Sequence, residues 1–229
     1  YFLINFYYLL NNYFAFIFVL LCPVLMLVGC KKYNSVTDNV SEITTIYYRG
    51  FDEASQAVGS ISVGRRETPY KIDGKHNKMT DFSLIDVNFN NDMNVDEIQA
   101  SIFINGVEES LTMYFNPMNH HYMADLGYSL SNGDQISLQY QGFNIAFADI
   151  TSTFAVDSSQ AISIAVGHLE NDLKSFYQNN QFKGECYLKI LTMQDEESGN
   201  LFWYFSAVSQ DGDKLDIVIS TADGSVIIG

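Results

Sequence analysis

Polar and apolar residues alternate through much of the chain between residues 42 and 151, and this alternation restricts the fold more than any other feature. Ile98, Ala100 and Ile102, for example, are separated by polar residues. Successive side chains of a β-strand point to opposite faces of its sheet, so this pattern predicts strands with one buried and one solvated face. The same pattern argues against a helical bundle, whose apolar residues would recur with a period near 3.6.

Turn signals between these stretches indicate that the strands are antiparallel. Asn105-Gly106 is the clearest, because both residues tolerate the positive φ of a type I′ hairpin turn. A series of short strands joined by such turns predicts an antiparallel β-sandwich over residues 42–151. Its strands are expected at residues 43–48, 58–63, 82–89, 98–104, 111–115, 122–126, 136–140 and 143–147.

The period changes from two to that of a helix after Asp157. Asp157 and Gln160 have the spacing of a capping box at a helix N-terminus. The helix is expected to end near Asn179 and Asn180, and strands are expected at residues 185–193, 201–209, 214–220 and 225–228. One face of the helix carries the apolar residues Ala161, Ala165, Leu169, Leu173 and Phe176.

Residues 157–229 resemble a PepSY domain. The resemblance rests on Ala161-Ile162-Ser163-Ile164-Ala165 in the helix, on the strand at 203–209 and on Ala222-Asp223-Gly224-Ser225-Val226. It implies a small domain of one helix and an antiparallel sheet over residues 152–229. The expected fold class is therefore α+β and mostly antiparallel β, with the sandwich followed by this domain.

The PepSY resemblance also implies a function without catalysis. It implies binding of protein or peptide, with control of a secreted peptidase as the role proposed for the family. An extended peptide could add a strand to the sheet edge at Tyr187–Met193 or Leu215–Ser220. Enzyme signatures such as a Gly-x-Ser-x-Gly elbow, His-Glu-x-x-His or a phosphate-binding glycine loop do not occur in the sequence. We therefore expect a protein that is not an enzyme and holds no cofactor.

The N-terminal segment predicts where the protein is found. Residues 1–29 carry no charged side chain and end in Leu27-Val28-Gly29-Cys30, directly before Lys31 and Lys32. This junction resembles a bacterial lipobox, which implies a signal peptide at 1–29, a lipid on Cys30 and a tether at 30–41. Two acyl chains suffice for stable anchoring, whereas one holds only marginally. The resemblance thus implies a lipoprotein on the extracytoplasmic face of the cell membrane.

An uncleaved transmembrane helix is the alternative interpretation of the same segment. About 20 apolar residues suffice to span a bilayer, and Lys31 and Lys32 would then favour a cytoplasmic C-terminal part. The chain opens with Tyr1 and has neither the initiator Met nor the positive start of a secretory signal. We therefore expect a truncated or misframed start.

Charge and cysteine content limit the partners further. The chain has 12 Lys and Arg against 27 Asp and Glu, a net charge of −15, and such a surface repels nucleic acid. After removal of the signal peptide and lipidation of Cys30, Cys186 remains alone. It alternates with Leu188 and Ile190 and is expected to be a buried small hydrophobe rather than a nucleophile.

A metal site receives little support from the sequence. His120 and His121 are adjacent and would point to opposite faces of a strand, and His76 and His168 are isolated. Residues 90–97 carry oxygen ligands at alternate positions but lack the Gly and Glu of an EF-hand loop. Two interpretations of this loop remain open, a solvated Asx-rich turn and a calcium loop that uses Asp92 and Asp96.

The loops support an alternative function. Together with Tyr122 and Tyr128, the acidic loop at 90–97 would suit a surface protein that binds a solute or carbohydrate through its sandwich loops, assisted by calcium. Two further features have competing interpretations. Arg65-Arg66 beside Glu67 would clamp an anion or form a solvated turn. Trp203 is expected in the core, so its neighbours Phe202 and Tyr204 would face the other side, as a binding platform or packed against the sandwich.

Overall fold

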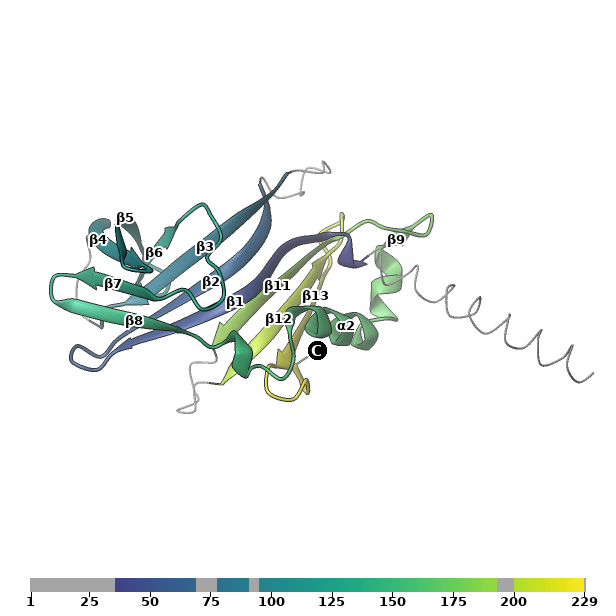
Figure 1. The fold of residues 1–229 in the computed structure, drawn as a ribbon. Helices are drawn as coiled ribbons and strands as arrows, with labels where there is room; N and C mark the ends of the chain where they lie inside the picture. The colour runs from purple at the N-terminus through teal and green to yellow at the C-terminus, as the bar shows by residue number, and fades with distance from the viewer. Residues whose placement is uncertain (1–35, 69–77, 91–94, 193–199, 229) are drawn as a thin grey trace, which may run out of the picture.

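The computed structural model describes residues 36–68, 78–90, 95–192 and 200–228 and shows a continuous β-sheet with one α-helix lying on part of it (Figure 1). In the described residues the order of the 12-stranded sheet is β14-β13-β12-β11-β1-β2-β3-β6-β5-β4-β7-β8, and β8 also pairs with β1. The strands from β1 to β8 therefore close into a barrel. They are β1 (Val40–Asp52), β2 (Ala57–Thr68), β3 (Lys78–Asn88), β4 (Glu97–Ile104), β5 (Val107–Asn116), β6 (His121–Asp125), β7 (Ile136–Tyr140) and β8 (Phe143–Asp149).

This closed barrel shows that the expected fold class is wrong. The chain has neither an N-terminal sandwich nor a separate helix-and-sheet domain behind it, because the C-terminal strands continue the barrel wall. Alternation shows that each strand has one buried face, but a sandwich and a barrel satisfy that condition equally well. The pairs that close the ring, such as Gly50 with Phe147, join residues far apart in the sequence, and alternation carries no information about them.

Side chains fill the interior of the barrel. Phe147 packs where Gly50 and Gly59 carry no side chain, since a Cβ at either glycine would come within 2.9 Å of its ring. The hydroxyl of Tyr122 donates to the Val95 carbonyl at 3.0 Å, and that of buried Tyr48 donates to the Ser131 carbonyl. The largest fully buried side chains of the barrel are Tyr48, Tyr122, Ile61, Ile85, Ile102, Met113, Leu138 and Ile145.

Strand β1 is shared between the barrel and the C-terminal sheet. Its first part pairs in parallel with β11 (Glu185–Thr192), from Val40 to Ile43, and its last part pairs with β8, from Tyr48 to Phe51. Between these parts the register with β2 shifts, at a bulge between Thr44 and Ile46. Beyond the bulge Tyr48 belongs to the barrel interior and Tyr47 to the core beneath the helix.

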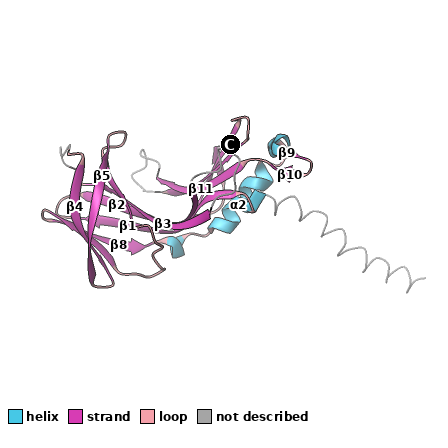
Figure 2. Ribbon diagram, turned by 90° about the horizontal axis from the view of Figure 1, so that it is seen from above, coloured by secondary structure: helices cyan, strands magenta, loops and turns pink. Residues whose placement is uncertain are grey.

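The C-terminal strands form an antiparallel sheet that the helix covers on one face (Figure 2). Helix α2 packs on this sheet through Ala161, Ala165 and Val166. Trp203 is fully buried below it and donates from Nε1 to the Val156 carbonyl at 2.8 Å. These elements are η2 (Thr151–Thr153), α2 (Ser158–His168), η3 (Asp172–Phe176), β9 (Tyr177–Gln178), β10 (Gln181–Phe182), β11, β12 (Leu201–Val208), β13 (Lys214–Ser220) and β14 (Val226–Ile228).

Helix α2 begins as predicted but ends earlier. It stops at His168, and a 3₁₀ turn then carries Leu173 and Phe176 into the same core. Asn179 and Asn180 have φ values of 51° and 60° and form the turn between β9 and β10. Because asparagine tolerates the left-handed region, this pair marks a hairpin here rather than the end of a long helix.

The capping box predicted for this helix is confirmed. The Asp157 carboxylate accepts from the Gln160 backbone N–H at 2.8 Å, and the Gln160 side chain accepts from the Asp157 N–H at 2.9 Å. The Gln160 N–H and then the Ser159 hydroxyl hold the pKa of Asp157 below its usual 3.8. A carboxyl group whose pKa falls on folding stabilises the protein above its unfolded pKa.

Asp157→Ala should therefore lower the free energy of unfolding by about 1 kcal/mol at pH 7. The difference between wild type and variant should shrink as the pH falls below about 4 and through the folded pKa of Asp157, because the protonated carboxyl is a poorer acceptor. Urea unfolding at pH 7 and pH 3 measures both values. Asp157→Asn, which keeps an acceptor but does not titrate, is the control. An Asp157→Ala difference of equal size at both pH values would contradict this account.

Candidate functional site

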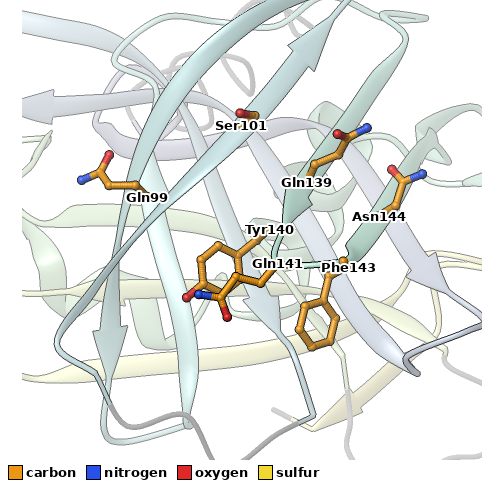
Figure 3. Close-up of a pocket in the computed structure, with 8 residues that line it drawn as sticks. Gln99, Ser101, Gln139, Tyr140, Gln141, Phe143 and Asn144 are labelled. Atoms are coloured by element: carbon orange, nitrogen blue, oxygen red, sulfur yellow. The ribbon is translucent and has the colours of Figure 1, made fainter.

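An open groove lies on the outer wall of the barrel, where β4, β7 and β8 run side by side (Figure 3). Its volume is about 580 Å³. We call it the amide groove, after the side chains that dominate its lining. The lining residues are Gln99, Ser101, Gln139, Tyr140, Gln141, Gly142, Phe143 and Asn144.

Strand alternation places the polar side chains on this wall. Ile102 and Leu138 point into the barrel core, so Ser101 and Gln139, one position away on the same strands, point outward. Ser101 pairs with Gln139, and Gln139 pairs with Asn144 on the next strand. Neighbouring strands are about 4.8 Å apart, so these three side chains form a row about 10 Å long across the wall.

A tight turn closes one end of the amide groove. Gln141 and Gly142 have φ values of 44° and 93° and connect the paired residues Tyr140 and Phe143, as a two-residue turn does. The rings of Tyr140 and Phe143 pack against Phe89, with centroid distances of 5.4 and 5.0 Å. Both residues are half-buried, so the rings are held in place and keep part of their surface open.

The hydrogen-bonding groups of the groove are largely available. The side-chain amides of Gln139, Gln141 and Asn144 are exposed and bond to no other side chain or backbone group within the part of the chain that the structure describes. Two other lining residues already have partners. Ser101 Oγ donates to Glu108 Oε1 at 2.8 Å, and Gln99 Nε2 donates to a threonine hydroxyl at 2.9 Å. A primary amide offers both donors and an acceptor, so the groove presents three bifunctional groups and no charged lining side chain.

The loop residues expected to hold a solute do not line this groove. Asp92 lies outside the described residues, as do Cys30 and His76. Tyr122 is buried in the barrel, and burial raises the pKa of its hydroxyl. Tyr128 is 40% exposed and donates to Glu109 at 2.9 Å; burial and this carboxylate raise the pKa of Tyr128 to about 12.

The basic residues considered in the sequence are mostly paired. His121 contacts Asp86 through Nδ1, and the His120 ring packs against Phe115 at a centroid distance of 5.8 Å. Arg66 forms an ion pair with Asp125 and lies over the Phe82 ring, and His168 is exposed at the end of α2. Across residues 36–68, 78–90, 95–192 and 200–228, no group of three or more His, Cys, Asp or Glu side chains is placed to hold a metal ion.

Two residues of the C-terminal sheet lie where the sequence placed them. Cys186 and Trp203 are both fully buried in the core beneath α2, which confirms these two predictions. Their neighbours on the opposite face offer little open aromatic surface. Phe202 is only 5% exposed, and the Tyr204 hydroxyl donates to Asp216 Oδ1 at 2.6 Å. These two aromatic residues therefore do not form an open binding platform.

The sequence contained one signal for the amide groove that the sequence analysis missed. Gln141-Gly142 between two alternating stretches marks a hairpin, and outward-facing glutamine and asparagine side chains flank it on both strands. Gln99 and Ser101 come from a distant strand, and only the pairing of β4 with β7 brings them to the same place.

In the described part of the chain, no helix has the length and apolar character needed to cross a membrane. Comparison with protein-family models, with curated proteins and with solved structures found no match to this chain, so its function has to be argued from the chemistry of the amide groove itself.

Proposed function

We propose that the amide groove binds a neutral glycan. The observation that supports this function best is its lining: three available amide side chains and two half-exposed aromatic rings, without a charged residue, in a chain whose net charge is −15. Sugar hydroxyls donate and accept hydrogen bonds, as amides do. The apolar C–H face of a sugar ring can pack on Tyr140 or Phe143. Of the functions expected from the sequence, this favours the binding of a carbohydrate.

The size and charge of the groove narrow the ligand class. A volume of about 580 Å³ lies within the usual range of small-ligand sites, roughly 300–1,000 Å³. An anionic ligand would approach an acidic protein against its field, and a cationic ligand would find no carboxylate in the lining to neutralise it. A short uncharged oligosaccharide, with one or two sugar units in the groove, therefore fits best.

The proposed location is consistent with such a ligand. A lipid on Cys30 would hold the protein on the extracytoplasmic side of the membrane, where it meets polysaccharides of other cells or of the surroundings. This location follows from the lipobox-like residues and is part of the proposal. Calcium has no assigned part in it, because the groove lining contains no carboxylate.

A glycan array with neutral and charged oligosaccharides, followed by calorimetry with the best neutral binder, tests the proposal. Replacing Gln139 and Asn144 together with alanine should weaken binding about ten- to hundredfold, because each lost hydrogen bond contributes about 0.5–1.5 kcal/mol. Gln178→Ala, an exposed glutamine on β9, is the matched control and should bind like wild type. The proposal fails if no neutral glycan binds, or if the double variant binds the same glycan unchanged.

The other expected function, binding of protein or peptide with control of a peptidase, stays a prediction. Strand addition at Tyr187–Met193 is disfavoured, because β11 lies between β12 and β1 and pairs with β1 from Cys186 to Leu188. The edge at Leu215–Ser220 is only partly covered.

A further inference from the structure

The outer edge of β13 is only partly covered by a neighbouring strand. β13 pairs with β12 along its whole length, but β14 pairs only with Val218 and Ile219. From Lys214 to Ile217 the structure describes no strand on the other side. Unpaired backbone groups of this kind are a template for pairing with another chain.

The hydrogen bonds around β13 show which backbone groups point outward. Ser220 donates its N–H to the Ser225 carbonyl on the β14 side, and Ser209 donates to the Asp213 carbonyl on the β12 side. Backbone groups alternate in direction along an antiparallel strand. Asp216 and Lys214 therefore direct their N–H and C=O outward, as Ser220 and Val218 do, and the odd-numbered residues direct theirs toward β12.

We propose that this edge is an interface between two copies of the chain, which pair as antiparallel β13 strands around a two-fold axis at Leu215. In this arrangement Lys214 lies opposite Asp216 of the partner subunit, and Asp216 lies opposite the partner subunit's Lys214. Each of these pairs can exchange two backbone hydrogen bonds, because both residues direct their groups outward. The interface is isologous, as a two-fold axis requires.

Charge and the position of β14 select this register among the alternatives. Only outward-facing residues can form the hydrogen-bonded pairs, so the other registers place Lys214 opposite Lys214, or Asp216 opposite Asp216. Both bring like charges together, which destabilises a cross-strand pair. The register centred on Asp216 would also place Lys214 opposite Val218 of the other copy, a position that β14 already occupies.

The side chains at this edge are already held in position. Lys214 Nζ lies 2.9 Å from Asp216 Oδ2 on its own strand and donates to the Tyr204 hydroxyl at 2.7 Å. The Lys214 and Asp216 side chains remain 52% and 39% exposed, so each can take a second partner of opposite charge. On the other face Leu215, which is half-buried against the core beneath α2, would meet its own copy at the axis.

The interface is small, and each copy carries a net charge of −15. Interfaces at the low end of the size range are typical of transient association. The proposed dimer is therefore weak and forms with rising protein concentration.

Two single charge reversals, tested separately and mixed, examine the register. Lys214→Glu places Glu opposite Asp, and Asp216→Lys places Lys opposite Lys, so each variant should self-associate at least tenfold more weakly than wild type. In a mixture, the two acidic side chains of one variant face the two basic side chains of the other. Association should then recover. Sedimentation velocity of the full chain in a mild detergent, with one variant fluorescently labelled, measures all three cases.

Lys174→Glu is the matched control, since it makes the same charge change at an exposed position in η3, away from β13. Thermal unfolding of each variant shows that the fold is retained. The proposal is overturned if wild type shows no concentration-dependent association, if the single reversals associate as well as wild type, or if mixing them restores nothing. Binding of an extended peptide at this edge by a protein that remains monomeric would also overturn it.

Discussion

Replacing Gly64 with alanine should lower the free energy of unfolding by about 3 kcal/mol, the upper end of what overpacking usually costs. An added Cβ would overlap the backbone carbonyl oxygen of Ile43 and lie 2.9 Å from its carbonyl carbon. Because the obstacle is backbone, no side-chain rotation can relieve it. Gly64 lies opposite the bulge at which β1 passes from the C-terminal sheet into the barrel, so the strain should affect both cores.

Thermal unfolding monitored by circular dichroism and by fluorescence of Trp203, the only tryptophan, measures this effect. About 3 kcal/mol corresponds to a fall in Tm of roughly 6–12 °C in a protein of this size. Gly167→Ala is the control: this glycine lies in α2 with no atom within 4 Å of an added Cβ. It should be neutral or stabilise by up to about 1 kcal/mol. If Gly64→Ala is equally harmless, β1 and β2 do not approach each other as described.

Replacing Cys30 with alanine should abolish membrane association of the full chain and the attachment of lipid. Each buried lipid methylene contributes about 0.8 kcal/mol to membrane binding, so losing two acyl chains removes the proposed anchor completely. Intact mass and fractionation of membranes from soluble protein measure both effects. Wild type should lack residues 1–29 and carry a lipid increment. Cys22→Ala, in the apolar segment before the lipobox-like residues, should behave like wild type.

The opposite outcome would also be informative. An uncleaved chain that stays in the membrane without Cys30 would mean that residues 1–29 form a transmembrane helix. Lys31 and Lys32 would then favour a cytoplasmic C-terminal part. The proposed glycan would in that case have to be an intracellular one.

Local sequence pattern was sufficient to locate the strands and the start of the helix. The Asn105-Gly106 hairpin is confirmed, with Ile104 paired to Val107 and both turn residues at positive φ. Hairpin turns and capping boxes involve residues within a few positions of one another, so their geometry depends on few distant contacts. The end of the helix was less predictable, because the apolar face continues past His168 through a 3₁₀ turn.

The amide groove could not be assembled from the sequence in the same way. Gln139 and Asn144 come from one hairpin and could be placed together, but Ser101 joins them only because β4 pairs with β7. Glutamine, asparagine and serine on the wet face of a strand occur in many proteins without any site. Their meaning here depends on three strands meeting with these residues in one row.

The sequence by itself determined which segments become strands, where the helix begins and which residues, among them Cys186 and Trp203, are buried, because period and capping are local properties of the chain. Only the tertiary structure decided that the strands close into a barrel, that β1 joins this barrel to the helix-covered sheet, and that β13 keeps a free edge. These features depend on long-range strand pairing, such as β1 with β8 and with β11. Many pairings satisfy the same alternation, and packing contacts such as that of Phe147 against Gly50 and Gly59 distinguish them.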